Sequence, residues 1–418
     1  MKTKLMILIL VLVLPMVITA QDDQTDADSV AQADGIELAD SVTRVQRPFR
    51  QVVLERIDSL MTDTLFETSQ IGLMIWDLTD DTQLYSLNAR QLMRPASTMK
   101  LLTAITALDK LGPGYRYTTS LYYKGTVTQG RFNGDVIVVG GMDPLFGRSD
   151  MQAFVQALKQ KGITSLHGRI ITDCSMKDGD KWGEGWCWDD DNPTLTPLLY
   201  DRKANFQGQL LRDLRAAHIQ TAGVSVVAGT LPSGAIHLCT RSHGINEVLQ
   251  QMMKESDNLF AESTFYQVAA STGHRPAKAK DARMVEQSLF AKLGLDGTRY
   301  GLADGSGLSL YNYLSAEAQV TLLRYAWQNA QLYQALLPTL PIAGKDGTLR
   351  ARMTDTPAQD NVQAKTGTVT GISSLAGYLT APDGHRLCFC IINQGLKRAS
   401  DGRAFQDKLC IALCQPQE

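Results

Sequence analysis

The spacing of apolar and polar residues changes along the chain, and each change predicts a different element. Residues 45–65 repeat apolar side chains at helical spacing, and residues 71–89 alternate like a hairpin that turns at Asp80 and Asp81. In MKLLTAITALDKLG, residues 99–112, apolar residues recur at i, i+3, i+4 and i+7, and a glycine ends the run. A helix, a hairpin and a buried helix predict the beginning of one α+β unit.

The next stretch has the texture of a second, β-rich unit. Short apolar runs separated by glycines predict strands, and one longer run predicts a helix at residues 150–162. Helical spacing resumes at residues 245–270. We therefore expect one or more inserted domains at 112–242, and a main domain built from 45–111 and 243–418. The four expected strands of the insertion are residues 116–127, 134–141, 168–174 and 223–230.

Residues 1–20 predict export. Lys2 and Lys4 precede a short apolar run that ends in small residues, which is the pattern of a secretory signal peptide. An uncleaved anchor is the alternative, but the run is shorter than the roughly 20 residues that a spanning helix needs. Residues 21–41 carry seven acidic residues and no basic one, so we expect a flexible acidic tether over 21–44. The mature chain is expected in the periplasm or cell envelope, without a transmembrane span.

Composition excludes some classes of function. The chain has 418 residues, 44% of them hydrophobic and 20% charged, and a net charge of −2, so it has no basic excess for nucleic acid. Seven cysteines and six histidines show no metal-ligand spacing, and we expect no metal or other cofactor. Cys388 and Cys390 fall on one face of an expected strand, which favours core packing, whereas Cys174 and Cys187 are the local candidates for a disulfide.

Three short motifs carry the candidate chemistry. They read Ser-x-x-Lys, Ser-x-Asn and Lys-Thr-Gly, at Ser97–Lys100, Ser256–Asn258 and Lys365–Gly367. Each has a plain structural explanation alone, because a serine at a helix start is usually an N-cap and a lysine on an edge strand opposes aggregation. Together, and in this order, they resemble the active-site set of the penicillin-recognising serine enzymes, the serine β-lactamases and penicillin-binding proteins.

This resemblance gives the motif residues roles in acyl transfer. Ser97 is the expected nucleophile, and Lys100, one helical turn away, is the expected general base. Lys365 is expected to supply positive charge that lowers the pKa of Lys100 and attracts an anionic substrate. Ser256 would relay a proton to the leaving amine.

Other residues are expected to hold the substrate. Asn258 would hydrogen-bond a backbone amide of the substrate, and Thr366, Gly367 and Thr368 would receive its terminal carboxylate. The backbone N–H groups of Ser97 and Thr368 would form the oxyanion hole.

Longer blocks narrow the resemblance to one family. RPASTMKLLTA, GGMDPLF, MMKESDNLFAE, ADGSGLS, LPIAGKDGTLRAR and QAKTGTVTGISSLAGYL follow in this order between about Arg50 and Asn393. They resemble the D-alanyl-D-alanine carboxypeptidase/endopeptidase family of class C low-molecular-mass penicillin-binding proteins. The fold this implies is an α+β, β-lactamase/transpeptidase-like sandwich, with an antiparallel five-stranded sheet, helices on both faces and a large β-rich inserted domain.

The resemblance also implies an activity. The chain would cleave the D-Ala–D-Ala bond of peptidoglycan stem peptides, and often cross-links between them, through an acyl-enzyme on Ser97. β-Lactam antibiotics would acylate the same serine. One alternative is a β-lactamase or esterase on the same scaffold, which the large insertion and the lack of an obvious deacylation carboxylate disfavour. Another is a non-catalytic cell-wall-binding or β-lactam-sensing protein, which has no need of Ser97 and Lys100 together.

Some positions depart from the family pattern. Leu310 follows ADGSGLS where the family commonly has a basic residue suited to a stem-peptide carboxylate, and Met142 and Lys177 are also unusual. A further block that resembles the family, DCS at residues 173–175, contains Asp173; Asp173 and Arg352 are further candidates for secondary substrate contacts. Unless Arg352 or Lys177 supplies the missing charge, we expect weak discrimination between free and amidated carboxylates on the third stem residue.

Overall fold

The computed structural model describes residues 48–190 and 192–416. The predicted signal peptide (1–20) and all of the predicted tether (21–44) lie outside this part of the chain. Within it, no helix combines the length and the apolar character that a membrane span requires.

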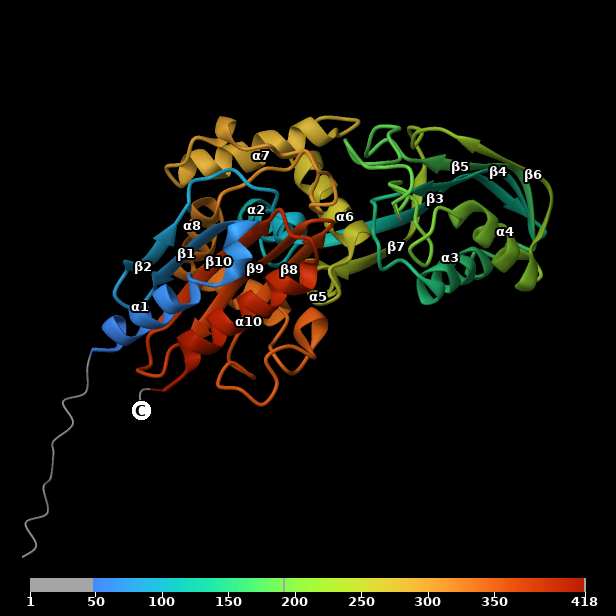
Figure 1. The fold of residues 1–418 in the computed structure, drawn as a ribbon. Helices are drawn as coiled ribbons and strands as arrows, with labels where there is room; N and C mark the ends of the chain where they lie inside the picture. The colour runs from blue at the N-terminus through green and yellow to red at the C-terminus, as the bar shows by residue number, and fades with distance from the viewer. Residues whose placement is uncertain (1–47, 191, 417–418) are drawn as a thin grey trace, which may run out of the picture. The chain divides into compact units, whose positions relative to one another are not determined.

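The first sheet is antiparallel throughout and has the strand order β2-β1-β10-β9-β8 (Figure 1). The predicted hairpin turns between β1 and β2 at Asp81, whose φ is 50°. β8 is an edge strand, but Lys365 on it is fully buried, so the plain explanation that this lysine opposes aggregation is wrong. The five strands are β1 (Gln70–Asp77), β2 (Thr82–Leu87), β8 (Gln363–Val369), β9 (Ile372–Thr380) and β10 (Arg386–Gln394).

Helices cover both faces of this sheet. On one face lie α1 (Phe49–Leu60) and α10 (Ala399–Cys414), and on the other α2 (Met99–Leu111) and α8 (Ala316–Gln328) (Figure 1). Successive side chains of a strand point to opposite faces, and β1 follows this rule. Leu73 and Ile75 pack in the core under α1 and α10, whereas Met74 packs in the core under α2 and α8. The predicted α+β sandwich is therefore confirmed.

α2 is buried along its first ten residues. Every residue from 99 to 108 is buried, because the helix lies between the sheet and further helices. Gly112 ends it at a φ of 82°, a conformation that favours glycine. These further helices are α5 (Ile245–Lys254), α6 (Asn258–Ala270), α7 (Ala279–Lys292) and α9 (Ala330–Leu336).

A second five-stranded sheet, in the order β6-β5-β4-β3-β7, is mixed (Figure 1). β3 pairs antiparallel with β4 and β7, and β5 pairs parallel with β4 and β6. The helices α3 (Arg148–Gln160) and α4 (Phe206–Ala216) contribute to its core. The five strands are β3 (Arg116–Thr128), β4 (Arg131–Val139), β5 (Ser165–Asp173), β6 (Gln220–Ala228) and β7 (Ile236–Gly244).

The sequence indicated β3 to β6 and α3 but missed β7 and α4. β7 is an edge strand that carries two histidines, an arginine and a serine, so it lacks an apolar run. α4 is short and has Gly208 inside it. The described residues, 48–190 and 192–416, pack as one unit, and the division of this unit at 112 and 242 stays a prediction.

Four of the seven cysteines are buried in the core. Cys388 and Cys390 are fully buried on one face of β10, as predicted. All seven cysteines carry free thiols, so the disulfide expected between Cys174 and Cys187 is not formed.

Candidate active site

Ser97 lies in a short 3₁₀ turn, η2 (Ala96–Thr98), that leads directly into α2. The carbonyl oxygen of Pro95 fixes this turn, because it accepts hydrogen bonds from Thr98 Oγ1 at 2.7 Å and from Ser374 Oγ of β9 at 2.6 Å. Ser97 is only half-buried, and α2 has no side-chain N-cap. The hydroxyl of Ser97 is therefore available for chemistry and does not cap the helix.

Lys100 is fully buried beside Ser97. Its Nζ donates to Ser97 Oγ at 2.9 Å, to Asn258 Oδ1 at 2.8 Å and to the Ser306 carbonyl oxygen at 2.7 Å. Burial lowers the pKa of Lys100 to about 8, although nearby carboxylates partly oppose the shift. About one tenth of such a lysine is neutral at pH 7, and the neutral amine can accept the proton of Ser97.

Lys365 forms a second buried pair with a serine. Its Nζ donates to Ser256 Oγ at 2.9 Å and to the Thr366 carbonyl oxygen at 2.8 Å. Burial and the charge of Lys100 hold the pKa of Lys365 well below its usual range. Ser256 has a φ of 59°, the left-handed conformation, in the turn between α5 and α6. The structure thus joins residues of all three motifs in one polar cluster.

Polar contacts on both sides of Ser256 hold its loop in place. Asp257 caps α6 by accepting from the Phe260 N–H, and it also forms an ion pair with Arg202 from the segment before α4. Lys254 donates to Asp346 at 2.6 Å. A pocket of about 240 Å³ opens next to this loop. It is lined by Pro193, Arg202, Asp257, Asn258 and Leu259.

β8 approaches the nucleophile through Gly367. A Cβ on this residue would lie 2.9 Å from the Ser97 backbone nitrogen, 2.7 Å from the Pro95 carbonyl oxygen and 2.2 Å from Ser374 Oγ. Only a residue without a side chain allows this approach. Thr368 follows and is exposed, and Thr366 donates from Oγ1 to Thr348 Oγ1 at 2.8 Å. The backbone of β8 is therefore next to the Ser97 N–H, where an oxyanion hole is expected.

The secondary candidates do not gather at Ser97. Arg352 pairs with Asp407 of α10 at 2.7 Å, and the Asp173 carboxylate accepts from the Ser175 and Leu231 N–H groups at 2.9 and 2.7 Å. These polar groups are used inside the fold.

The departures from the family pattern have different surroundings. Met142 is fully buried in the core, and the buried Lys177 pairs with Asp178 at 2.7 Å. Leu310 is 37% exposed, and its carbonyl oxygen accepts from Arg94 Nε at 3.0 Å. Sequence reasoning missed Arg94 as a cation at this position, although it begins the block RPASTMKLLTA.

The sequence analysis also gave no role to the buried acids around Lys100. Glu262, Asp257 and Asp304 all raise its pKa and so oppose the effect of burial. Asp304 and Glu262 lie inside the quoted blocks ADGSGLS and MMKESDNLFAE, and this position within the motif blocks was the signal that could have revealed them.

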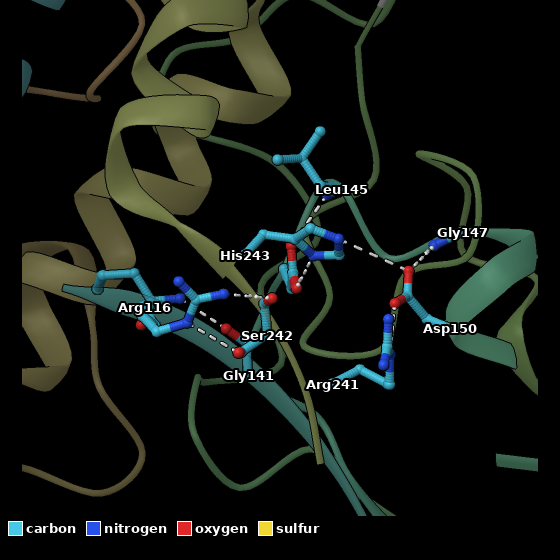
Figure 2. A network of polar contacts seen from close by, with 10 residues as sticks. Arg116, Gly141, Leu145, Gly147, Asp150, Arg241, Ser242 and His243 are labelled. Atoms are coloured by element: carbon cyan, nitrogen blue, oxygen red, sulfur yellow. Dashed lines mark hydrogen bonds and ion pairs between the residues drawn. The ribbon is translucent and has the colours of Figure 1, made fainter. Parts of the chain in front are cut away.

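The block GGMDPLF belongs to a different polar network, which joins the loop before α3 to β7 of the second sheet. Asp143 accepts from His243 Nδ1 at 2.7 Å and from the Leu145 N–H at 3.0 Å, and Asp150 pairs with Arg241 at 2.7 Å. Figure 2 shows His243 of β7 beside the loop that leads into α3. These contacts fasten the loop to β7 and give the block a structural role.

One group of side chains in the described part could hold a metal ion. Asp77, Asp80 and His385 place one ligand atom each within 4.8 Å of one another. His385 already contacts Asp77 at 2.7 Å, which raises the pKa of the histidine. The group lies where β10 begins, whereas Gln394 at the other end of β10 contacts Arg94. It is therefore separate from the cluster around Ser97.

Comparison with known proteins agrees with this geometry. The fold is that of the transpeptidase-like class: penicillin binding protein 4 (dacB) from Haemophilus influenzae superposes with a TM-score of 0.77 at 24% identity, over 84% of this chain and 97% of that one. A structure of the same protein complexed with a β-lactam gives 0.70 at 24% identity, over 85% and 98%. Residues 53–198 and 198–414 match the model of the D-Ala-D-Ala carboxypeptidase 3 (S13) family.

Sequence relatives point the same way. D-alanyl-D-alanine carboxypeptidase DacB from Haemophilus influenzae is 25% identical over 79% of this chain and 86% of the relative. D-alanyl-D-alanine carboxypeptidase from Actinomadura sp. (strain R39) is 26% identical over 86% of this chain and 84% of the relative. The chain belongs to the D-Ala-D-Ala carboxypeptidase 3 (S13) family and is a peptidase of this class.

Proposed function

We propose that this protein is an exported serine-type D-Ala-D-Ala carboxypeptidase, and also a DD-endopeptidase, that cleaves peptidoglycan stem peptides through an acyl-enzyme on Ser97. One observation supports the mechanism above all. Lys100 Nζ is fully buried, has a pKa lowered to about 8 and lies 2.9 Å from Ser97 Oγ. Family membership supplies the reaction class, and this pair supplies a nucleophile with its base.

Acylation begins with the transfer of one proton. Neutral Lys100 accepts the hydroxyl proton of Ser97 while Oγ attacks the carbonyl carbon of the penultimate D-Ala. The oxygen of that carbonyl becomes negative and is met by the backbone N–H groups of Ser97 and Thr368. Each such donor contributes about 3–4 kcal/mol in other acyl-transfer enzymes. Preorganisation of these donors depends on the close approach of Gly367 to Ser97.

The leaving amine then needs a proton. Ser256 is the relay because its hydroxyl accepts from Lys365 and so lies on a chain of polar groups. It donates its own proton to the amine as the C–N bond breaks and recovers one from Lys365, which is restored by the proton that Lys100 took from Ser97. Water hydrolyses the ester on Ser97 and regenerates the enzyme.

Substrate binding follows from the charge near β8. The terminal carboxylate of the stem peptide is an anion, and Lys365, Thr366 and Thr368 offer it a cation and two hydroxyls. Asn258 orients the peptide through a backbone amide. An endopeptidase substrate presents the same D-Ala acyl group with a larger leaving amine, and the half-exposed position of Ser97 leaves room for it.

β-Lactams are inhibitors in this proposal. Their strained amide is attacked by the same serine, and the acyl-enzyme persists because the leaving amine stays attached. Residues 1–20 direct export and residues 21–44 tether the folded chain, so the enzyme would meet peptidoglycan in the periplasm or cell envelope. No metal ion or organic cofactor takes part in these steps.

Product analysis tests this function. The full mature chain is incubated with a stem pentapeptide and with purified cross-linked muropeptides, and the products are measured by mass spectrometry. We expect release of one D-Ala from the pentapeptide and conversion of cross-linked dimers to monomers, both absent in Ser97→Ala. Turnover of a chromogenic cephalosporin without peptide cleavage would instead identify a β-lactamase. Covalent penicillin labelling without any turnover would identify a sensor.

A further inference from the structure

Three buried carboxyl groups lie behind Lys100, and the proposed mechanism uses none of them. Glu262 is on α6, Glu286 is on α7, and Asp304 is in the segment before α8. Each is 1% exposed. Burial of a charge without partners is costly, so the hydrogen bonds of each carboxyl group indicate what it does.

Asp304 and Glu286 differ most in the number of hydrogen bonds that their carboxyl groups accept. Asp304 accepts four hydrogen bonds, from Trp186 Nε1, the Gly307 and Ser309 N–H groups and Asn312 Nδ2, so it organises its own loop. Glu286 has no hydrogen-bond partner for either oxygen among the described residues. Burial and the neighbouring acids raise the pKa of Glu286 well above its usual range, which favours its neutral form.

Glu262 differs from both because its hydrogen-bond partner Ser306 also contacts Lys100. Its Oε1 accepts from the Gly305 N–H at 3.1 Å and from the Ser306 N–H at 2.8 Å. The carbonyl oxygen of the same Ser306 accepts from Lys100 Nζ at 2.7 Å. From the opposite side, Thr103 of α2 donates to the Gly305 carbonyl oxygen at 2.7 Å. The Gly305–Ser306 turn is therefore held between α6 and α2.

The same turn also contacts the peptide that carries the nucleophile. A Cβ on Gly307 would lie 1.9 Å from the Ala96 carbonyl oxygen, and Gly307 has a φ of +79°. A Cβ on Gly305 would lie 2.6 Å from Phe265 Cβ. The turn has no room to shift toward α6 or toward Ala96, so the acceptor at Ser306 is fixed relative to Ser97.

We propose that Glu262 is a positioning residue for Lys100: it holds the Ser306 carbonyl oxygen in place, and this acceptor and Asn258 orient Lys100 Nζ toward Ser97. An ammonium group has three N–H bonds in fixed relative directions. When Asn258 and Ser306 accept two of them, the third points at Ser97 Oγ. Loss of the Ser306 acceptor frees the amine to rotate. The inference rests on the proposed function, because it assumes that Lys100 is the base for Ser97.

Charge gives Glu262 a second, separable effect. Lys100 is faced by Lys365 from β8, by Asp257 at the start of α6, by Glu262 and by Asp304, with Glu286 behind them. Burial raises the pKa of Glu262 to about 8, and wherever this group is ionised its negative charge favours the ammonium form of Lys100. Its removal lowers the pKa of Lys100, so the neutral amine is present at lower pH.

Two substitutions separate position from charge. Glu262→Gln keeps an oxygen that can accept from Gly305 and Ser306 but removes the charge. Glu262→Asp keeps an ionisable carboxyl group but withdraws its oxygen by one methylene. Glu286→Gln is the matched control, because this neighbouring acid has no hydrogen bond to lose. The rate constant of acylation by a fluorescent penicillin and its binding constant are measured by stopped flow from about pH 5 to pH 10, with the unfolding temperature of each variant.

The expected outcomes differ between variants. Glu262→Asp should slow acylation about 10–100-fold at every pH, with the binding constant unchanged, because the base is misplaced. Glu262→Gln should keep the maximal rate within about threefold, and its rise with pH should move to lower pH. Glu286→Gln should match the wild type in both quantities.

Other outcomes would overturn the inference. A folded Glu262→Asp enzyme with the wild-type rate would show that the carboxylate does not position Lys100. Equal losses in Glu262→Asp and Glu262→Gln with an unmoved pH profile would show that Glu262 only supports the fold. If neither variant folds, Thr103→Val decides: it loosens the same turn, so slower acylation with unchanged binding supports the proposal and a wild-type rate contradicts it. Failure of the wild type itself to label would count against the proposed function instead.

Discussion

A substitution that changes the pKa of Lys100 is the most direct test of the proposed mechanism. Asn258 Oδ1 lies 2.8 Å from Lys100 Nζ, and Asn258→Asp replaces a neutral acceptor there with a carboxylate of the same shape. The new anion favours the ammonium form and raises the pKa of Lys100. An opposite charge at this range shifts a pKa by about 1–3 units.

The magnitude follows from the lowered starting value. With a pKa of about 8 in the wild type, about one tenth of Lys100 is neutral at pH 7. In Asn258→Asp this fraction falls by a further factor of about 10–1000. Acylation at pH 7 should fall by the same factor, and the rise of the rate with pH should move up by about 1–3 units.

Asp257→Asn is the matched variant with the opposite sign. Its carboxylate raises the pKa of Lys100, and asparagine is an equally good N-cap for α6. The rise of the acylation rate with pH should therefore move to lower pH in Asp257→Asn. The assay is the acylation rate constant of a fluorescent penicillin across pH, with the unfolding temperature as a control for folding.

Two results would refute this reasoning. If Asn258→Asp lowers the rate equally at all pH values, Asn258 contributes only to substrate binding and Lys100 is not the titrating base. If Asn258→Asp and Asp257→Asn shift the profile in the same direction, the charge near Lys100 does not control acylation.

Three further predictions concern β8 and the rim of the site. Lys365→Gln should reduce hydrolysis of a peptide ending in D-Ala-D-Ala more than acylation by its C-terminal amide, and equal losses in kcat/KM would show that Lys365 tunes proton transfer instead. Gly367→Ala should slow acylation on the order of a hundredfold because its Cβ meets the Ser97 nitrogen at 2.9 Å, and a wild-type rate would contradict the close approach of β8. The wild type should discriminate less than about tenfold between stem peptides with a free and an amidated third-residue carboxylate, and Leu310→Arg should raise the preference for the free carboxylate about 10–100-fold. A stronger preference in the wild type that Arg94→Gln removes would show that Arg94 has taken this role.

Much of the catalytic cluster could be predicted because its residues lie in short local motifs. Ser97 and Lys100 are one helical turn apart, so helical periodicity alone places their side chains together. The burial of α2 also follows from a local pattern, the helical spacing of its apolar residues. The contact between Ser97 and Lys100 was expected from their one-turn spacing, whereas the contact between Ser256 and Lys365 was not predicted; the structure adds both distances and the burial that lowers both lysine pKa values.

Features that depend on distant residues could not be predicted in this way. Glu262 acts through Ser306, and Arg94 meets Leu310, so no window of the sequence contains both partners. Arg352 was a substrate candidate only because the position of α10, where Asp407 pairs with it, was unknown. β7 was missed because an edge strand that is partly exposed on both faces has no apolar run.

The central claim is that Ser97 is the nucleophile of this peptidase. The full mature chain is incubated with benzylpenicillin, and intact-mass measurement is followed by mapping of the modified peptide. We expect one adduct per chain, on the peptide that contains Ser97. It should be lost in Ser97→Ala while the unfolding temperature is kept, because the serine is only half-buried. An adduct on another residue, or one that persists in a folded Ser97→Ala variant, would contradict the account.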